Sequence, residues 1–214
     1  MEAGGIVTDI NGNDIRFDKP CSIIATNNKE NYLKYFNENI DSEITISNIT
    51  IDSCIFDKID FGNINIDNVD LMDVIFNECD LSNKVFDNKL VTRVIFKDCK
   101  MIGTSFINSS LKDVKFINCK CRYLNFYGAK INNVLIKDSE FIETSFIENN
   151  IKNLYLDNVN LNKTEILKTN LNKIDFSNSD IENVLFDNYS LKGIIVNSFQ
   201  CRYLVGLLGV EVKE

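Results

Sequence analysis

An apolar residue recurs at every fifth position from Ile46 to Val196, and this period constrains the chain more than any other feature. We call these apolar residues centres. A period of five matches neither a helix, which repeats every ~3.6 residues, nor a strand, which repeats every ~2. Residues two places before each centre are mostly apolar or small, and Asn or Gly often stands two places after it. Because Asn and Gly tolerate a left-handed backbone, each unit is predicted to be a short strand plus a corner, and the run of units predicts a solenoid.

The phenylalanines add a second period, of twenty residues. One series contains Phe56, Phe76, Phe96, Phe116 and Phe176, and another, offset by ten, contains Phe86, Phe106, Phe126, Phe146 and Phe186. Twenty residues are four units, so each coil should have four sides. Phenylalanine then stacks on two opposite sides and mostly aliphatic residues fill the other two, which packs a narrow interior. The run should form nearly eight coils.

These residues strongly resemble the pentapeptide-repeat proteins over residues 46–196. The resemblance implies an all-β solenoid, a right-handed quadrilateral β-helix. Residues 1–45 should form a hairpin around Asn11-Gly12 and a short amphipathic helix over Asn28–Asn39 that covers the first coil. Residues 197–214 should hold a short helix, Phe199–Leu208, which Ser198 can cap and Gly209 can end.

The cysteines fit the interior of such a rod. Cys79, Cys99 and Cys119 stand twenty residues apart, each two places before a centre, so they should stack in one column. Stacked backbones lie near the disulfide range, yet in a cytosolic protein we expect small buried thiols ahead of disulfides. A zinc site is less expected still, because a dry column offers no tetrahedral arrangement. We therefore predict no metal and no cofactor.

Composition argues against several functional classes. The 214 residues include no histidine, and no nucleophile elbow or phosphate-binding glycine loop is present, so we do not expect an enzyme. The formal net charge of −8 lacks a bulk basic footprint for direct nucleic-acid binding. Apolar runs are too short to span a membrane, and we find no secretory signal, so a cytoplasmic location is expected.

Two features inside the repeat are candidate partner surfaces. Lys84 and Lys89 occupy the inward position two places before a centre, so either the corner bulges or the ammonium groups reach outward. This can equally be local irregularity. The second candidate is an outward apolar stripe that includes Ile75, Ile95, Leu135 and Tyr155. It is either a surface for a partner or a column of β-forming side chains.

The tail resembles that of the Qnr-type quinolone-resistance proteins. The matching residues are Leu191, Gly193, Phe199 followed by Gln200, then Leu204, Gly206, Leu208 and Gly209. In that group the tail joins two rods end to end. The resemblance therefore implies a C-terminal homodimer, whose interface would contain Val196, Phe199, Leu204, Val205, Leu207 and Leu208.

The same resemblance implies a DNA-mimicking regulator or protector of DNA gyrase or topoisomerase IV, whose carboxylates would face a basic DNA-binding surface. Charge along the chain opposes this, because residues 91–140 hold nine bases against four acids between two acidic stretches. The unbroken register also leaves no room for the loop insertions that many Qnr-type proteins carry. The alternative is a scaffold or binding module for a protein unrelated to topoisomerase. A surface negative along one whole face favours mimicry, and a banded surface favours another partner.

Overall fold

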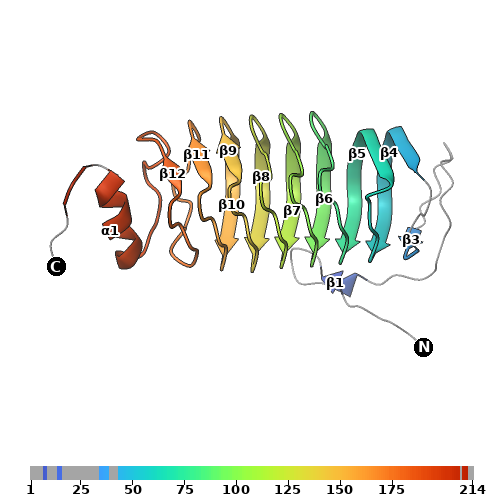
Figure 1. Cartoon of the computed structure of the whole chain (residues 1–214), viewed down its shortest axis with the longest axis horizontal. Helices are drawn as coiled ribbons and strands as arrows, with labels where there is room; N and C mark the ends of the chain where they lie inside the picture. Colours follow the sequence, from blue (N-terminus) through green and yellow to red (C-terminus); the bar gives the residue numbers. More distant parts are fainter. Residues whose placement is uncertain (1–6, 9–13, 16–33, 39–42, 208, 212–214) are drawn as a thin grey trace.

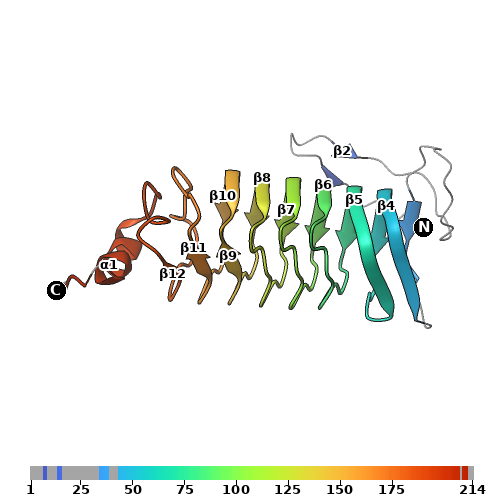
Figure 2. The ribbon, with the colours of Figure 1, turned by 90° about the horizontal axis from the view of Figure 1, so that it is seen from above.

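The computed structural model describes residues 7–8, 14–15, 34–38, 43–207 and 209–211. The chain winds into a parallel β-solenoid with one helix at its C-terminal end (Figures 1 and 2). The elements, in chain order, are β1 (Val7–Thr8), β2 (Asp14–Ile15), β3 (Lys34–Phe36), β4 (Ile44–Asp57), β5 (Ile64–Asn77), β6 (Leu90–Lys97), β7 (Ser110–Ile117), β8 (Lys130–Lys137), β9 (Ser145–Ile147), β10 (Asn150–Asp157), β11 (Glu165–Leu167), β12 (Leu185–Phe186) and α1 (Ser198–Leu207).

Strands of successive coils pair in parallel with a register of twenty residues. Phe56 faces Phe76, which in turn faces Phe96. The solenoid has a seven-stranded sheet in the order β10-β8-β7-β6-β5-β4-β3 and a three-stranded sheet in the order β12-β11-β9. The twenty-residue period thus sets the coil, and the predicted all-β solenoid is confirmed, with about seven turns where nearly eight were expected.

The corners fall two residues after the centres. Non-glycine residues adopt positive φ there at five-residue intervals, among them Asn48, Ser53, Lys58 and Asn68. Positive φ alone therefore does not demand glycine in this fold. Gly128 is different, because a Cβ at that position would lie 2.2 Å from Oδ1 of Asn108 in the preceding coil. The absence of a side chain makes room for the amide below it.

The interior holds two phenylalanines in almost every complete coil, counted from centre to centre. Their rings stack between coils, with centroids 5.2 Å apart for Phe76 and Phe96 and 4.8 Å apart for Phe126 and Phe146. The coil from Leu156 to Leu171 has aliphatic centres alone. A small apolar cavity lies at that level, lined by Phe146, Ile151, Leu154, Leu156, Leu161, Ile166, Leu171 and Phe176.

The N-terminal part departs from the predicted helix. β1 and β2 pair antiparallel where the hairpin was predicted. The helix expected over Asn28–Asn39 is wrong at β3, which pairs in parallel with Cys54–Phe56; residues 28–33 and 39 lie outside the described part. Tyr35 and Phe36 stand twenty residues before Ile55 and Phe56, so extending the register satisfies the exposed edge of β4 with backbone pairing. The register therefore reaches further toward the N-terminus than Ile46.

At the C-terminal end, α1 begins one residue earlier than expected and has a different cap. Oδ1 of Asn197 accepts hydrogen bonds from the backbone N–H groups of Phe199 and Gln200, both at 3.0 Å. Oε1 of Gln200 accepts one from the backbone N–H of Asn197 at 2.8 Å, which completes a reciprocal capping box. Asn197, rather than Ser198, is thus the cap. Gly209 follows the helix with a φ of +76°.

Candidate interaction surfaces

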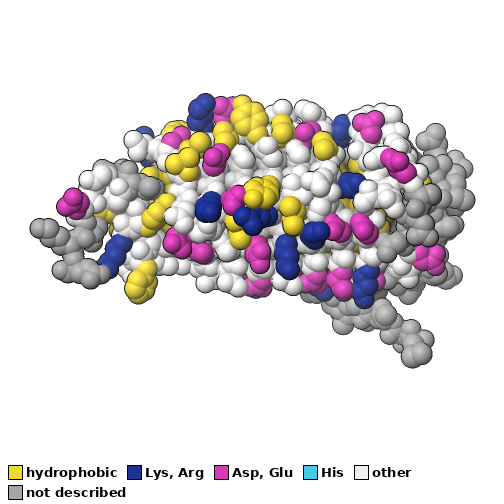
Figure 3. Space-filling view, viewed as in Figure 1, with side chains coloured by type: hydrophobic (Ala, Val, Ile, Leu, Met, Phe, Trp, Pro, Cys, Tyr) yellow, Lys and Arg dark blue, Asp and Glu magenta, His cyan; other side chains and the backbone are white. Residues whose placement is uncertain are grey.

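Ion pairs link neighbouring coils on the outside of the rod. Lys100 contacts Asp80 at 2.8 Å, and Lys168 contacts Glu148 at 2.9 Å, each across one twenty-residue step. The hydrogen bond from Lys168 holds the pKa of Glu148 below its usual range. Figure 3 shows basic and acidic side chains interspersed along the visible side of the rod. Several charges of the basic middle segment are therefore matched by acids one coil away.

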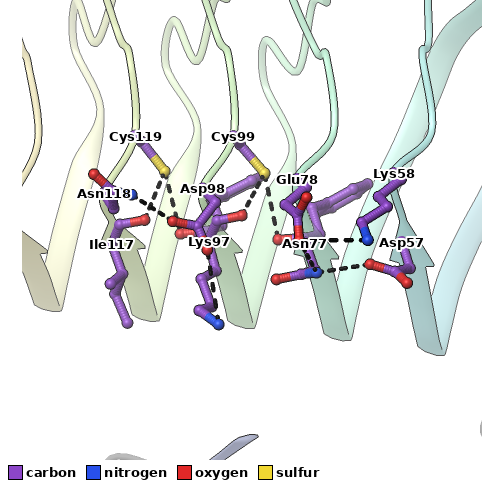
Figure 4. Close-up of polar contacts among 12 residues, drawn as sticks. Asp57, Lys58, Asn77, Glu78, Lys97, Asp98, Cys99, Ile117, Asn118 and Cys119 are labelled. Carbon is purple, nitrogen blue, oxygen red and sulfur yellow. Dashed lines mark hydrogen bonds and ion pairs between the residues drawn. The ribbon is translucent and has the colours of Figure 1, made fainter. Parts of the chain in front are cut away.

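Amide and carboxylate side chains form a second set of rungs (Figure 4). Nδ2 of Asn77 donates to Asp57 at 2.6 Å, and Nδ2 of Asn118 donates to Asp98 at 2.5 Å. Each of these hydrogen bonds joins equivalent positions of adjacent coils, so part of the hydrogen-bonding capacity of the carboxylates is used within the solenoid. They form no uninterrupted row of free acids along this corner.

The outward apolar stripe is not uniformly exposed. Ile75 and Ile95 are only 6% and 9% exposed, which corrects the expectation that they are surface anchors. With Ile55 they form a separate buried cluster, against which Ile117 packs. The hairpin of β1 and β2 lies beside this part of the rod in both ribbon views (Figures 1 and 2).

Further along the same stripe, the side chains are more exposed to solvent. Leu135 is half-buried and Tyr155 is 54% exposed. Of the four residues proposed for this surface, Tyr155 is therefore the most accessible to a partner, and whether it binds one stays a prediction.

The two inward lysines reach outward. Nζ of Lys84 donates to the backbone carbonyl of Ile64 at 2.8 Å, and Nζ of Lys89 donates to Oδ1 of Asn68. Both side chains are half-buried. An ammonium group is costly to bury without a partner, and both charges find oxygen acceptors in the preceding coil. Their part in partner binding stays a prediction.

Side-chain hydrogen bonds hold helix α1 at the C-terminal end of the solenoid. Nε2 of Gln200 donates to the carbonyls of Phe176 and Ser179 at 2.8 and 2.6 Å, and the hydroxyl of Tyr203 donates to that of Val184 at 2.9 Å. These bonds fix α1 against the last coil.

The apolar residues proposed for the dimer differ in exposure. Val196 and Leu204 pack against the core, and Val205 is half-buried. Phe199, in contrast, is 85% exposed. Leu208 lies outside the described residues, and the side chain of Leu207 is not described.

The six described cysteines are free thiols, five of them buried and Cys201 exposed. Among the described residues, no group of three or more metal-ligating side chains is gathered. The same part of the chain contains no helix with the length and apolarity needed to cross a bilayer.

Sequence comparison identifies the repeat. The family model described as "Pentapeptide repeat region" matches residues 69–146. The chain carries a pentapeptide-repeat region. No curated protein matches this pentapeptide-repeat chain.

Solved structures were also compared with the pentapeptide-repeat rod. Full-length QnrB1, a plasmid-mediated fluoroquinolone resistance protein, is 17% identical with a TM-score of 0.40, covering 81% of this chain and 100% of QnrB1. HetL, involved in heterocyst differentiation regulation in the cyanobacterium Nostoc, is 15% identical with a TM-score of 0.27, covering 76% of this chain and 90% of HetL.

Sequence reasoning missed two features of the surface. The Asn197–Gln200 capping box could have been found from its spacing, because an Asn followed three residues later by Gln marks a helix start. The second is the distribution of lysines among the four sides of the coil, which the twenty-residue period of the sequence encodes but a count along the chain does not reveal.

Proposed function

We propose that this chain acts without catalysis, as a rigid rod whose outer sides bind a macromolecular partner. The packed interior carries this proposal: the cavity among the described residues is apolar and is lined by core side chains. Such a cavity lacks the convergent polar groups of a substrate site. Charged and amide side chains instead line the outside, where they are spaced by the coil.

The specific candidate is regulation or protection of DNA gyrase or topoisomerase IV by DNA mimicry. The resemblance of the tail to the Qnr-type proteins and the net charge of −8 support it. A continuous acidic stripe is the physical requirement, because a basic DNA-binding surface is attracted to regularly spaced negative charge. The ion pairs and amide rungs weaken such a stripe.

The alternative partner is a protein unrelated to topoisomerase, for which this chain is a scaffold. The banded charge and exposed Tyr155 favour it. In both cases we propose a homodimer through the C-terminal end, where Phe199 is exposed. We also propose a cytoplasmic location, since free thiols suit a reducing compartment.

A titration into a DNA gyrase supercoiling reaction, with and without a fluoroquinolone, separates these partners. Topoisomerase regulation predicts inhibition of supercoiling by the protein alone, or recovery of supercoiling in the presence of the drug. Unchanged activity in both reactions would reject gyrase, and an unchanged topoisomerase IV decatenation reaction under the same titration would leave the scaffold. Heat-unfolded protein at the same concentration is the control for non-specific effects of an acidic polymer.

A further inference from the structure

One side of the rod is basic over its C-terminal five coils. We call it the lysine face: the outer side of segments 109–113, 129–133, 149–153, 169–173 and 189–193. Each segment carries one exposed lysine, and these are Lys112, Lys130, Lys152, Lys173 and Lys192. The single acid of the five segments is Asp113, which accepts a hydrogen bond from Nδ2 of Asn133 at 2.6 Å.

Backbone pairing places these segments side by side. Lys130 stands between Ser110 and Asn150, and the backbone N–H of Lys173 donates to the carbonyl of Gly193 at 2.8 Å. Adjacent parallel strands lie ~4.8 Å apart, so the five lysines extend over ~20 Å of the rod. They form a row because the fold stacks them, although they are about twenty residues apart in sequence.

The lysines of the row have no short ion pair among the described residues. None of the seven ion pairs found among the described residues includes a lysine of the lysine face. Elsewhere on the rod, Arg93, Lys137 and Lys168 each pair with an acid of an adjacent coil. A chain with a net charge of −8 thus keeps five cations in one exposed row, where like charges repel unless an anion binds.

We propose that the lysine face binds an extended acidic segment of a partner protein. The row is narrow, because acids that are in none of the seven ion pairs occupy the neighbouring sides; these include Glu165 and Asp187 on one side and Asp138 and Asp175 on the other. A single extended chain fits within such a strip, and at ~3.3 Å per residue about six or seven residues match its length. Exposed amides between the lysines can hydrogen-bond to peptide groups; these are Asn150, Asn170 and Asn172.

The same features disfavour nucleic acid. A duplex is wider than this strip, so its phosphates would also meet the flanking acids within a Debye length of ~8 Å. Single-stranded nucleic acid usually stacks its bases on aromatic side chains. Tyr189, near the end of the row, is the one aromatic residue in the five segments.

The inference rests on the proposed binding function and names the chemistry of the partner. It is tested with a fluorescent peptide of about seven glutamates, matched in length to the row at ~3.3 Å per residue. Binding is measured by anisotropy at low and physiological salt. The test variant carries Lys112→Glu, Lys152→Glu and Lys173→Glu. The control carries Lys97→Glu, Lys120→Glu and Lys163→Glu, which are exposed elsewhere and change net charge equally.

We expect the wild-type protein to bind the peptide, the lysine-face variant to lose ~10-fold or more in affinity, and the control to lose less than ~3-fold. Circular dichroism must show both variants folded. Absence of wild-type binding, or equal losses in both variants, overturns the proposal. So does tighter binding of a single-stranded or duplex oligonucleotide that the same variant abolishes, because the partner would then be nucleic acid.

The gyrase titration and the peptide titration test different proposals, so a negative result in one does not decide the other. Altered supercoiling without peptide binding rejects the lysine face alone. Peptide binding without any effect on gyrase or topoisomerase IV rejects topoisomerase regulation alone.

Discussion

At the level of single residues, the inward position two places before a centre explains the column of Cys79, Cys99 and Cys119. Two places before a centre, a side-chain donor bonds to the carbonyl of a centre in the preceding coil. Sγ of Cys99 donates to Phe76 at 3.3 Å, and Oγ1 of Thr104 donates to Leu81 at 2.9 Å. Thiol and hydroxyl therefore perform the same task, which is to satisfy a buried acceptor. The cysteine column has a structural reason that requires neither metal nor disulfide.

The buried thiols should be chemically inert in the folded protein. All five thiols are buried, so a reagent in solution cannot reach them. Burial also raises the pKa of the Cys121 thiol well above its ordinary value, and the thiolate is the reactive form. In a Cys21→Ser/Cys201→Ser variant, a thiol-specific chromogenic reagent should label nothing under native conditions. After denaturation it should label the five remaining thiols, which are Cys54, Cys79, Cys99, Cys119 and Cys121. Rapid native labelling would show that the core opens or that these thiols are accessible.

At the level of the coil, the number of phenylalanines controls packing. Ile136 stands in a phenylalanine column, and Phe141 compensates by supplying a ring from the adjacent side, 5.5 Å from that of Phe116. The coil from Leu156 to Leu171 has no such compensation and contains the cavity. Composition along the twenty-residue period thus predicts where the rod is underpacked.

Filling this cavity should stabilise the protein. Ile166→Phe places a ring between the levels of Phe146 and Phe186, and we expect a gain of ~1 kcal/mol in the free energy of unfolding. Ile136→Phe is the matched control, because Phe141 already fills that level; overpacking should cost ~1–3 kcal/mol. Denaturant unfolding of both variants measures the difference. Destabilisation by Ile166→Phe comparable to the control would show that the cavity cannot accept a ring.

Ion pairs between coils should make stability fall in acid. Hydrogen bonds from Arg122, Lys168 and Lys137 hold the pKa values of Glu143, Glu148 and Asp157 below their usual range. Because the folded-state values are the lower ones, these carboxylates stabilise the fold above the unfolded values of ~4 and lose that effect as pH falls through the folded values. The melting temperature should be steady from pH 7 to ~5 and should decline below ~4.

The cationic partners test the origin of this decline. An Arg122→Gln/Lys137→Gln/Lys168→Gln variant should show a smaller decrease in melting temperature between neutral and acidic pH. An equally steep decrease would assign acid sensitivity to other carboxylates. Since these groups are exposed, added salt should reduce the difference between variant and wild type.

For the whole molecule, periodicity predicts the fold far better than the function. Stacking of identical positions makes the coil, the corners and the phenylalanine columns readable from spacing alone. The burial of Ile75 and Ile95 was not readable, because it depends on packing outside the periodic core. The lysine face was encoded in the same spacing, yet it becomes visible only when charges are sorted by side. A partner has no such period, so its identity requires surface chemistry and experiment.

Assembly of the rod depends on its C-terminal end, and Phe199 offers the cleanest test. This side chain is 85% exposed, so Phe199→Asp should leave α1 docked by Gln200 and Tyr203 while placing a charge in the proposed interface. Sedimentation should show a dimer for the wild type, and Phe199→Asp should raise the dimer dissociation constant by ~10-fold or more. Tyr155→Asp, on the side of the rod, should sediment like the wild type.

A wild-type monomer rejects the dimer, whereas a Phe199→Asp dimer as stable as the wild type places the interface elsewhere. Truncation after Val196 is a less specific test, because it also removes the hydrogen bonds and the Leu204 packing that close the last coil.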